Sequence, residues 1–246
     1  TSTSGLRTRG GCDAMNVELV KEYYVEAAHC APECGVNGAR QHGHSFRIEI
    51  VVAGPVESPY GWLIDFSEIT GAFEPLRRQL DHSDLNKIPG LETPSFEGLA
   101  AWLDKGLRPA LPMLKEVRVT AAGAGDFAPQ ELDEDLFRNL PRRLRFSFEA
   151  AQSLPHLPDG HPCRGLHGHT YHVEAGAMDL MRLWGHLRGL YEALDHRYLN
   201  EVAGIGAATS ERLCAWIWDF LSRSIDDLNI VVVQETNSAR CIYRGK

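Results

Sequence analysis

Four features are missing from this sequence of 246 residues, and each absence argues against a class of protein. There is no run of about 18 apolar residues, so the sequence predicts no membrane-spanning helix. There is no excess of positive charge, because 25 Lys and Arg stand against 33 Asp and Glu, and this argues against a nucleic-acid binder. The six cysteines are irregularly spaced and form no disulfide framework, so we expect reduced thiols. Residues 1–11 lack an apolar signal segment, which favours a cytoplasmic protein.

The histidines, by contrast, are numerous and unevenly placed. All eleven fall between positions 29 and 82 or between positions 156 and 196. Each of these windows contains one His-Gly-His tripeptide, His42-Gly43-His44 in the first and His167-Gly168-His169 in the second. This pairing indicates an internal repeat.

Other landmarks repeat at a nearly constant spacing. Asp81-His82 recurs as Asp195-His196, an offset of 114 residues, and Glu26-Ala27-Ala28 recurs as Glu149-Ala150-Ala151, an offset of 123 residues. We therefore predict a tandem duplication, with a first unit over residues 12–122 and a second unit over residues 144–246. The acidic segment 123–143 between them is expected to be a solvated linker.

Each unit shows the pattern of an α+β fold. Alternating apolar and aromatic residues predict strands over 20–28 and 45–52, and the apolar spacing predicts a helix that begins at Asp65 or Ser67 and ends at Leu80. A second helix follows Ser95, and a further strand covers 117–119. The second unit repeats this order. The expected architecture is an antiparallel sheet with two helices packed on one face.

Three histidines of the first unit have the spacing of a metal site. His42 and His44 are two residues apart, so on a strand both side chains point to one face. His29 ends the preceding strand, where antiparallel pairing brings it alongside them. Three imidazoles around one open position are typical of catalytic zinc. The alternative is that His-Gly-His forms a turn with solvent-exposed rings.

Several motifs together resemble a known family. In the first unit they are Ala27-Ala28-His29, His42-Gly43-His44, residues 61–66 and Leu80-Asp81-His82, and in the second unit Cys163, His167-Gly168-His169, Glu235-Thr236 and residues 241–245. This pattern resembles the 6-pyruvoyl-tetrahydropterin synthase and 6-carboxytetrahydropterin synthase family. The bacterial 6-carboxytetrahydropterin synthases, which serve queuosine and 7-deazapurine biosynthesis, look most similar.

The resemblance implies both a fold and a reaction. The fold is the T-fold, which assembles from several subunits into barrels with active sites at the subunit interfaces, so a homo-oligomer is expected. The reaction is that of a zinc-dependent lyase on the small pterin 7,8-dihydroneopterin triphosphate, which loses triphosphate while its side chain rearranges or is cleaved. Neither a nucleic acid nor a membrane is expected as a partner.

The metal ligands that the resemblance implies differ between the two units. In the first unit they are His29, His42 and His44. In the second unit the same positions hold Gln152, His167 and His169, and an amide is a poor zinc ligand beside imidazole. We therefore expect Zn²⁺ in the first unit and no tight zinc site in the second.

The resemblance also implies a cysteine that moves a proton. Cys163 stands four residues before His167, which is the bacterial spacing, whereas the matching position of the first unit is Gly38. Cys34 is the nearest substitute there, with Cys30 as the second choice. The alternative for any of these thiols is a small buried side chain without a chemical role.

The remaining implied site residues are acids, hydroxyls and two histidines. The pairs Asp81-His82 and Asp195-His196 would relay protons, each Asp holding its imidazole in one tautomer, or they would merely cap helix ends. Glu235 would anchor the pterin ring through charge-assisted hydrogen bonds, whereas the first unit has Ala121 at that position. The segment that assists the anchor is Thr209-Ser210-Glu211.

The losses of the two units are complementary, since one unit keeps the metal ligands and the other keeps the pterin anchor. One interpretation is a composite site in which His29, His42 and His44 hold zinc while Glu235 and Thr209 hold the pterin. The competing interpretation is a T-fold protein that binds a pterin or purine without catalysis, or acts as a partner subunit of an active relative.

Overall fold

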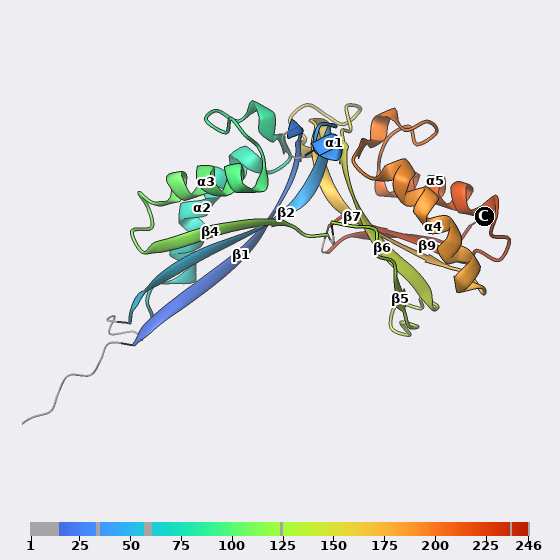
Figure 1. Cartoon of the computed structure of the whole chain (residues 1–246), viewed down its shortest axis with the longest axis horizontal. Coiled ribbons are helices and arrows are strands. Elements are labelled where there is room, and N and C mark those ends of the chain that lie inside the picture. The colour runs from blue at the N-terminus through green and yellow to red at the C-terminus, as the bar shows by residue number, and fades with distance from the viewer. Residues whose placement is uncertain (1–14, 33–34, 57–60, 124, 237, 246) are drawn as a thin grey trace, which may run out of the picture.

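A computed structural model describes residues 15–32, 35–56, 61–123, 125–236 and 238–245. These residues form two similar α+β units, with the two long helices of each unit on opposite flanks and the strands β2 (His42–Pro55) and β7 (His167–Gly176) meeting between them (Figure 1). Within this described part of the chain, no helix is both long enough and apolar enough to span a membrane.

The first unit is a four-stranded sheet covered by two long helices, and its strand order is β3 (Ser83–Asp84), β1 (Asn16–His29), β2 and β4 (Leu114–Ala121). Its main helix starts after Asp65, whose side chain accepts a hydrogen bond from the Ser67 N–H, and Ser95 caps the next helix in the same way. Both predicted helices are confirmed. The helix after Asp65 is α2 (Phe66–Leu80), and the helix after Ser95 is α3 (Phe96–Leu107). Two short helices complete the unit, α1 (Gly35–Gly38) and the 3₁₀ helix η2 (Leu85–Lys87).

The second unit repeats this architecture. Its strand order is β10 (Arg240–Tyr243), β9 (Ile230–Gln234), β7, β6 (Arg143–Gln152) and β5 (Gln130–Leu132), and the short strand β8 (Arg197–Tyr198) also pairs in parallel with β6. Its helices begin after Asp179 and Thr209, the counterparts of Asp65 and Ser95. The helix after Asp179 is α4 (Leu180–Leu194), and the helix after Thr209 is α5 (Ser210–Ser222). Two 3₁₀ helices complete the unit, η3 (Pro162–Arg164) and η4 (Leu199–Glu201).

Each unit has its own apolar core between its helices and its sheet. In the first unit the sheet contributes the buried Phe46 to this core and helix α2 contributes Phe73. In the second unit the sheet contributes Phe148 and helix α5 contributes Ile217. Because burial of one such side chain contributes about 1.5–3 kcal/mol, these two cores hold the helices against the sheets. The α+β prediction is therefore confirmed for both halves of the chain.

The segment 123–143 is more than the solvated linker that its acidic composition suggested. Its residues Gln130–Leu132 form β5, which pairs antiparallel with Arg143–Arg145 at the edge of the second sheet. A further bridge joins Asp135 to Leu140. Part of the connection between the units therefore belongs to the second sheet, because strand pairing satisfies its backbone polar groups.

The two sheets approach each other most closely at the two His-Gly-His tripeptides. A methyl group placed on Gly43 would lie 2.4 Å from Gly168 Cα and 2.6 Å from Ala27 O, so only glycine allows this approach. Ser45 N–H donates to Thr170 Oγ1 and Thr170 N–H donates to Ser45 Oγ, both at 3.1 Å. The contact is therefore reciprocal and resembles a local two-fold axis.

The expectation of a barrel is not met within one chain. The described strands belong to two separate open sheets, and no strand ladder closes them into a barrel. The reason is that β2 and β7 meet through side chains and glycines rather than through paired strand edges. A closed barrel would need further copies of the chain.

Candidate active site

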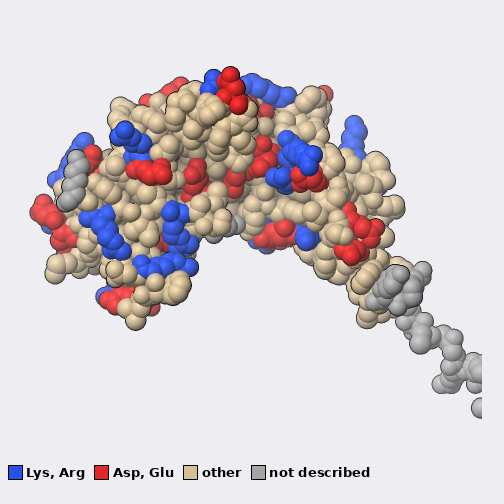
Figure 2. Space-filling view, turned by 180° about the vertical axis from the view of Figure 1, so that it is seen from behind, with Lys and Arg blue, Asp and Glu red and all other residues tan. Residues whose placement is uncertain are grey.

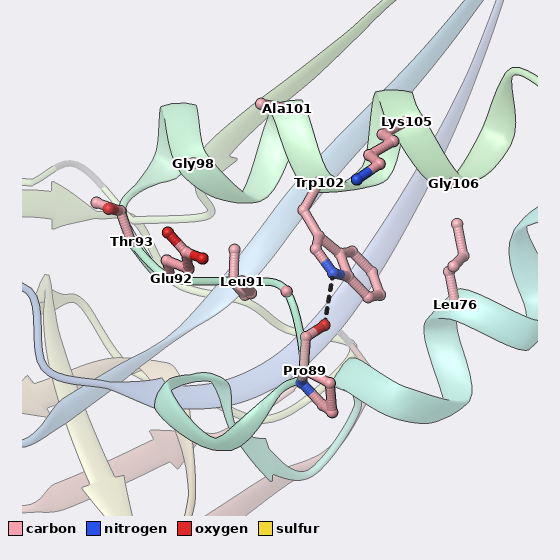
Figure 3. A pocket seen from close by; sticks show the side chains of 11 residues that line it. Leu76, Pro89, Leu91, Glu92, Thr93, Gly98, Ala101, Trp102, Lys105 and Gly106 are labelled. Atoms are coloured by element: carbon pink, nitrogen blue, oxygen red, sulfur yellow. Dashed lines mark hydrogen bonds between the residues drawn. The ribbon is translucent and has the colours of Figure 1, made fainter.

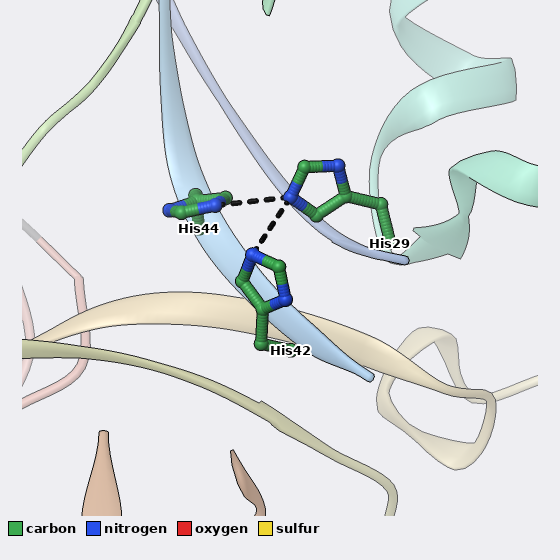
Figure 4. Close-up of side chains that lie close together, drawn as sticks. All are labelled: His29, His42 and His44. Atoms are coloured by element: carbon green, nitrogen blue, oxygen red, sulfur yellow. Dashed lines mark hydrogen bonds between the residues drawn. The ribbon is translucent and has the colours of Figure 1, made fainter. Parts of the chain in front are cut away.

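Three histidine side chains of the first unit converge, and we call this cluster the triad site. His29 at the end of β1 pairs in register with His42 at the start of β2, and His44 follows on the same face. The Nε2 atoms of His42 and His44 each lie 3.0 Å from His29 Nε2 (Figure 4). All three residues are buried. The strand geometry expected from the spacing is therefore present, and the exposed-turn alternative is wrong.

The other ring nitrogens of the triad point outward to acceptors. His29 Nδ1 donates to Pro94 O at 2.5 Å, and His42 Nδ1 donates to Arg40 O at 2.8 Å. His44 Nδ1 lies 2.9 Å from Glu149 Oε2. With the proton on each Nδ1, all three Nε2 lone pairs face one another, which is repulsive unless a cation lies between them. The triad therefore fits a metal ion on its own geometry.

The protonation of the triad agrees with this interpretation. Burial, reinforced by the neighbouring imidazoles, lowers the pKa of His42 to about 2. Burial, followed by the proximity of His196, lowers the pKa of His44 to about 3. Both rings are thus neutral at physiological pH, and neutral imidazole is the form that binds metal ions.

Two groups of the second unit complete the triad site. The imidazole ring of His196 packs against that of His42 with ring centroids 4.4 Å apart, and Asp195 Oδ2 lies 2.7 Å from His196 Nδ1. The carboxylate of Glu149 contacts His44 and also accepts a hydrogen bond from Thr170. Burial raises the pKa of Glu149 to about 8. A metal ion at the triad would offset this cost, because it attracts the ionised form.

The matching cluster of the second unit, which we call the anchor site, contains Gln152, His167, His169 and Glu235. The carboxylate of Glu235 lies between its neighbours, with Oε1 3.0 Å from His169 Nε2 and 2.5 Å from Gln152 Nε2. Its second oxygen accepts a hydrogen bond from the Ser210 hydroxyl at 2.7 Å. Glu235 therefore lies with the residues of its own unit, at the position where a metal ion would bind in the triad site.

Charge pairing stabilises the anchor site without a metal ion. Burial opposes protonation of His169, yet the carboxylates of Glu235 and Glu26 on either side raise its pKa to about 9. Burial also opposes ionisation of Glu235, but hydrogen bonds from His169, Ser210 and Gln152 lower its pKa to about 2. The site thus holds an imidazolium–carboxylate pair. His167, His169 and Glu235 are close enough to bind a metal ion, which would have to displace that proton.

A cysteine and a histidine from different units meet at the mouth of the anchor site. One ligand atom each of Cys163, His82 and His167 lies within 4.8 Å of the other two. Asp81 Oδ1 lies 3.3 Å from His82 Nδ1. Burial, together with the charges of Glu235 and Asp81, raises the pKa of the Cys163 thiol. The thiol is therefore protonated at neutral pH, and His82 is the base within reach.

The histidine of each Asp–His pair packs against a histidine of the other unit, His196 against His42 and His82 against His167. The same backbone arrangement holds both pairs. Asp81 and Asp195 end helices, and each accepts a hydrogen bond from the backbone N–H of Glu26 or Glu149. His82 and His196 then adopt left-handed backbone angles, with φ of 57° and 53°. Such angles are uncommon outside glycine and are found at functional sites. Each pair therefore caps a helix and also holds an imidazole beside a histidine of the other unit. A proton relay through these pairs stays a prediction.

The other expected site residues lie as follows. Thr209 caps α5, Ser210 contacts Glu235, and Glu211 is exposed on the first helical turn. Cys34 lies outside the described residues. Cys30 donates its thiol proton to Ala39 O at 3.2 Å, which is a structural contact.

The position that matches Glu235 is occupied by Ala121 in the first unit. In the first unit Thr120 pairs with Arg47 and the next residue, Ala121, pairs with Phe46. In the second unit Gln234 pairs with His172 in the same register, and the next residue is Glu235. Phe96 takes the place of Ser210, with its ring centroid 5.3 Å from that of His44. The wall beside the triad is therefore apolar where the anchor site is charged.

Sequence reasoning missed the two carboxylates that connect the units. Glu26 Oε2 lies 2.8 Å from His169 Nδ1, just as Glu149 lies against His44. The available signal was a glutamate retained at the same place in both units, next to two buried alanines. A charged side chain in an otherwise apolar strand end predicts a buried partner.

One hollow on the surface of the first unit is not part of either site. It has a volume of about 510 Å³ and lies between α2 and α3, around Trp102, Lys105 and Leu91 (Figure 3). The indole N–H of Trp102 donates to Pro89 O at 3.2 Å, and Trp216 makes the same contact with Ala203 O in the second unit. This repeated contact secures a loop against a helix, so the hollow is a feature of the fold.

Both halves of the chain match one protein family. The family model for 6-pyruvoyl tetrahydropterin synthase matches residues 18–123 and again residues 143–246. The chain therefore belongs to this family, and the resemblance expected from the motifs is confirmed.

The chain is similar to several named proteins. The chain is 35% identical over 121 residues to a 6-carboxy-5,6,7,8-tetrahydropterin synthase of Synechocystis, covering 46% of this chain and 94% of the relative. It is 35% identical over 71 residues to a dihydroneopterin monophosphate aldolase of Pyrococcus furiosus, covering 29% of this chain and 59% of the relative. A solved 6-pyruvoyl tetrahydropterin synthase of Caenorhabditis elegans aligns over 44% of this chain and 91% of its own, with a TM-score of 0.42 and 16% identity.

Proposed function

We propose that this protein is a zinc-dependent lyase of the tetrahydropterin synthase type. Its substrate would be 7,8-dihydroneopterin triphosphate or a close relative, and its reaction would resemble that of 6-carboxytetrahydropterin synthase, with elimination of triphosphate and cleavage of the side chain. The observation that carries the proposal is the triad of His29, His42 and His44, whose Nε2 atoms converge within 3.0 Å of His29 Nε2.

The triad residues would hold the metal ion, and neighbouring groups would move protons. Zinc supplies a Lewis acid that polarises substrate hydroxyl or carbonyl oxygens and acidifies the adjacent C–H. His196 lies against His42 and is oriented by Asp195, so it is placed to accept and return a proton there. Buried walls around the triad exclude water from the reacting groups.

The anchor site would supply binding and a second proton relay. Glu235 carries the negative charge that can accept hydrogen bonds from the ring N–H and amino groups of a pterin. Cys163 and His82, with Asp81 behind His82, form the thiol–imidazole arrangement at its mouth. Glu235 lies beside the His cluster of its own unit, whereas His82 and His196 each lie against a histidine of the other unit. The composite of the zinc ligands with Glu235 and Thr209 stays a prediction.

A second candidate is a protein that binds a pterin or purine without turnover. The observation in its favour is that each site lacks one component, since the triad site has Ala121 in place of an anchor and the anchor site has Gln152 in place of a metal ligand. The first proposal, that of a zinc-dependent lyase, also includes assembly of several chains into a barrel and a place in queuosine or other 7-deazapurine biosynthesis.

The deciding experiment is an anaerobic incubation with 7,8-dihydroneopterin triphosphate, followed by the mass of the product. The purified protein should contain about one zinc per chain, and His42→Ala should lose that zinc while His186→Ala, which changes an exposed helical histidine, should keep it. Turnover should follow the metal. No turnover combined with tight pterin binding would select the second candidate.

Two matched variants identify the site of turnover. His196→Ala should lower kcat by about 10²-fold or more with zinc retained, because it removes the proton carrier at the triad. His82→Ala should lower kcat by less than about tenfold, because it acts at the anchor site. The reverse order would assign the chemistry to Cys163 and the anchor site.

A further inference from the structure

A hollow at the mouth of the triad site carries two arginines from different units. It has a volume of about 480 Å³ and is lined by Arg40 and Gln41 of the first unit and by Leu166, His196, Arg197, Tyr198 and Glu201 of the second. We propose that Arg40 and Arg197 form a phosphate-binding subsite that holds the oligophosphate group of a substrate whose other end reaches the triad. This proposal rests on the proposed function for the identity of that substrate.

The backbone of each arginine adjoins a group of the triad site. The carbonyl oxygen of Arg40 accepts the hydrogen bond from His42 Nδ1, so the backbone of Arg40 orients a triad histidine. Arg197 follows His196, whose ring packs against His42. His196 lines the hollow and packs against His42, so a molecule held at the arginines meets the ring that adjoins the triad, within a hollow of a size usual for small ligands.

The fold itself does not require arginine at either position. In the anchor site Gly165 replaces Arg40, and its carbonyl oxygen accepts from His167 Nδ1 at 2.9 Å. Ser83 replaces Arg197 and pairs with Ala27 in the same register in which Arg197 pairs with Ala150. Glycine and serine thus perform the same backbone roles, and the positive charge at the triad site needs another reason.

The side chains of both arginines are exposed, and neither takes part in an ion pair with another described residue. One carboxylate, that of Glu201, lines the same hollow, so the two guanidinium groups outnumber it. At the corresponding place of the anchor site, Lys87 is paired with Asp84 at 3.2 Å. A net positive mouth therefore exists on one side of the pseudo-symmetric pair.

The surface as a whole does not attract anions. The net charge is −8, and positive and negative side chains are intermixed over the face seen in Figure 2. A guanidinium group binds phosphate through two parallel N–H···O bonds, which single out phosphate from weaker anions. The subsite is therefore a local feature of the triad mouth, and a triphosphate is the group that two arginines fit best.

Binding of inorganic triphosphate, measured by calorimetry, tests the subsite apart from turnover. The probe should bind to the zinc-loaded protein and, to separate the arginines from the metal ion, to the chelator-treated protein with an affinity within about threefold. Arg40→Ala and Arg197→Ala should each weaken binding by about tenfold or more. Glu201→Gln should strengthen it, and Arg78→Ala, which removes an exposed arginine of α2 outside the hollow, should leave it unchanged.

The outcomes separate the subsite from the proposed reaction. Triphosphate binding that depends on Arg40 and Arg197 without turnover of the pterin would support the subsite and contradict the proposed function. Turnover with an unchanged KM for the triphosphate substrate in both variants, and unchanged triphosphate binding, would overturn the subsite and leave the reaction standing. Equal binding of acetate and triphosphate would overturn the assignment to phosphate.

Discussion

His44 of the first unit lies with its Nδ1 2.9 Å from Glu149 Oε2 of the second, and His169 of the second unit lies with its Nδ1 2.8 Å from Glu26 Oε2 of the first. Each unit thus lends a buried carboxylate to a histidine of the other. The two contacts are geometrically alike but chemically different, because His44 faces the imidazoles of His29 and His42 while His169 faces the carboxylate of Glu235. The duplicated halves have therefore kept one interface while their sites have diverged.

We predict that Glu149→Gln lowers zinc affinity by about 10–100-fold, which is the usual effect of losing a carboxylate that orients a ligating histidine. The cause is loss of the negative partner of His44 Nδ1, since an amide stabilises the metal-bound imidazole less. Competition with a chromophoric chelator measures the change.

Glu26→Gln is the matched control for this variant, because Glu26 is the counterpart of Glu149 and contacts His169 instead of the triad. Zinc affinity should stay within about twofold of the original protein in that variant. Equal losses in the two variants would show that they act through the shared interface rather than through the metal site.

We predict that Gln152→His raises the zinc content from about one to about two ions per chain. The new imidazole would stand with His167 and His169 as His29 stands with His42 and His44, and three imidazoles suffice for zinc. Gln152→Asn, which keeps an amide, serves as the control and should leave the content unchanged. A content of one zinc in Gln152→His would mean that the pair of His169 and Glu235 outcompetes the metal ion.

We predict a pH dependence of stability that arises from His169. Its pKa is raised from 6.5 to about 9 in the folded protein by the carboxylates of Glu26 and Glu235, with Gln152 and His167 as its uncharged neighbours. A raised pKa contributes stability that is fully present below about pH 6.5 and is lost as the pH rises toward 9.

Glu235 determines how this stability is lost at low pH. Its lowered pKa, about 2, contributes stability that is present above its ordinary pKa of 4.5 and is lost as the pH falls toward 2. The pair is therefore worth most between about pH 4.5 and 6.5. The free energy of unfolding of His169→Gln, compared with that of the original protein, should differ most in this window and least near pH 9. A constant difference would rule out the charge pair.

The three histidines of the triad site could be predicted from the sequence, because their geometry is local. Strand periodicity places His42 and His44 on one face, and antiparallel pairing brings His29 beside them. The helix starts at Asp65 and Ser95 were predictable for the same reason, since a cap needs only a few neighbouring residues. Register and capping are decided within one hairpin or one helical turn.

The exchange between units could not be predicted in this way. His196 reaches His42 across 154 residues of chain, and nothing in either motif states which unit each Asp–His pair serves. The same holds for Glu149, whose partner His44 lies in the other sheet. Strand β5 was missed because the segment around Gln130 is short and acidic, and its pairing partner rather than its composition makes it a strand.

We predict that Gly43→Ala destabilises the fold at the junction of the two units. The added methyl group would lie 2.4 Å from Gly168 Cα and 2.6 Å from Ala27 O, and backbone on both sides leaves little room to move. Overpacking of this kind costs about 1–3 kcal/mol. Gly185→Ala is the matched control, because Gly185 lies within α4 with no atom within 4 Å of the added methyl group, and alanine there should be neutral or stabilising by up to about 1 kcal/mol. Denaturant unfolding of both variants measures the difference, and an equal free energy of unfolding in the two would mean that the sheets can separate at His-Gly-His without loss.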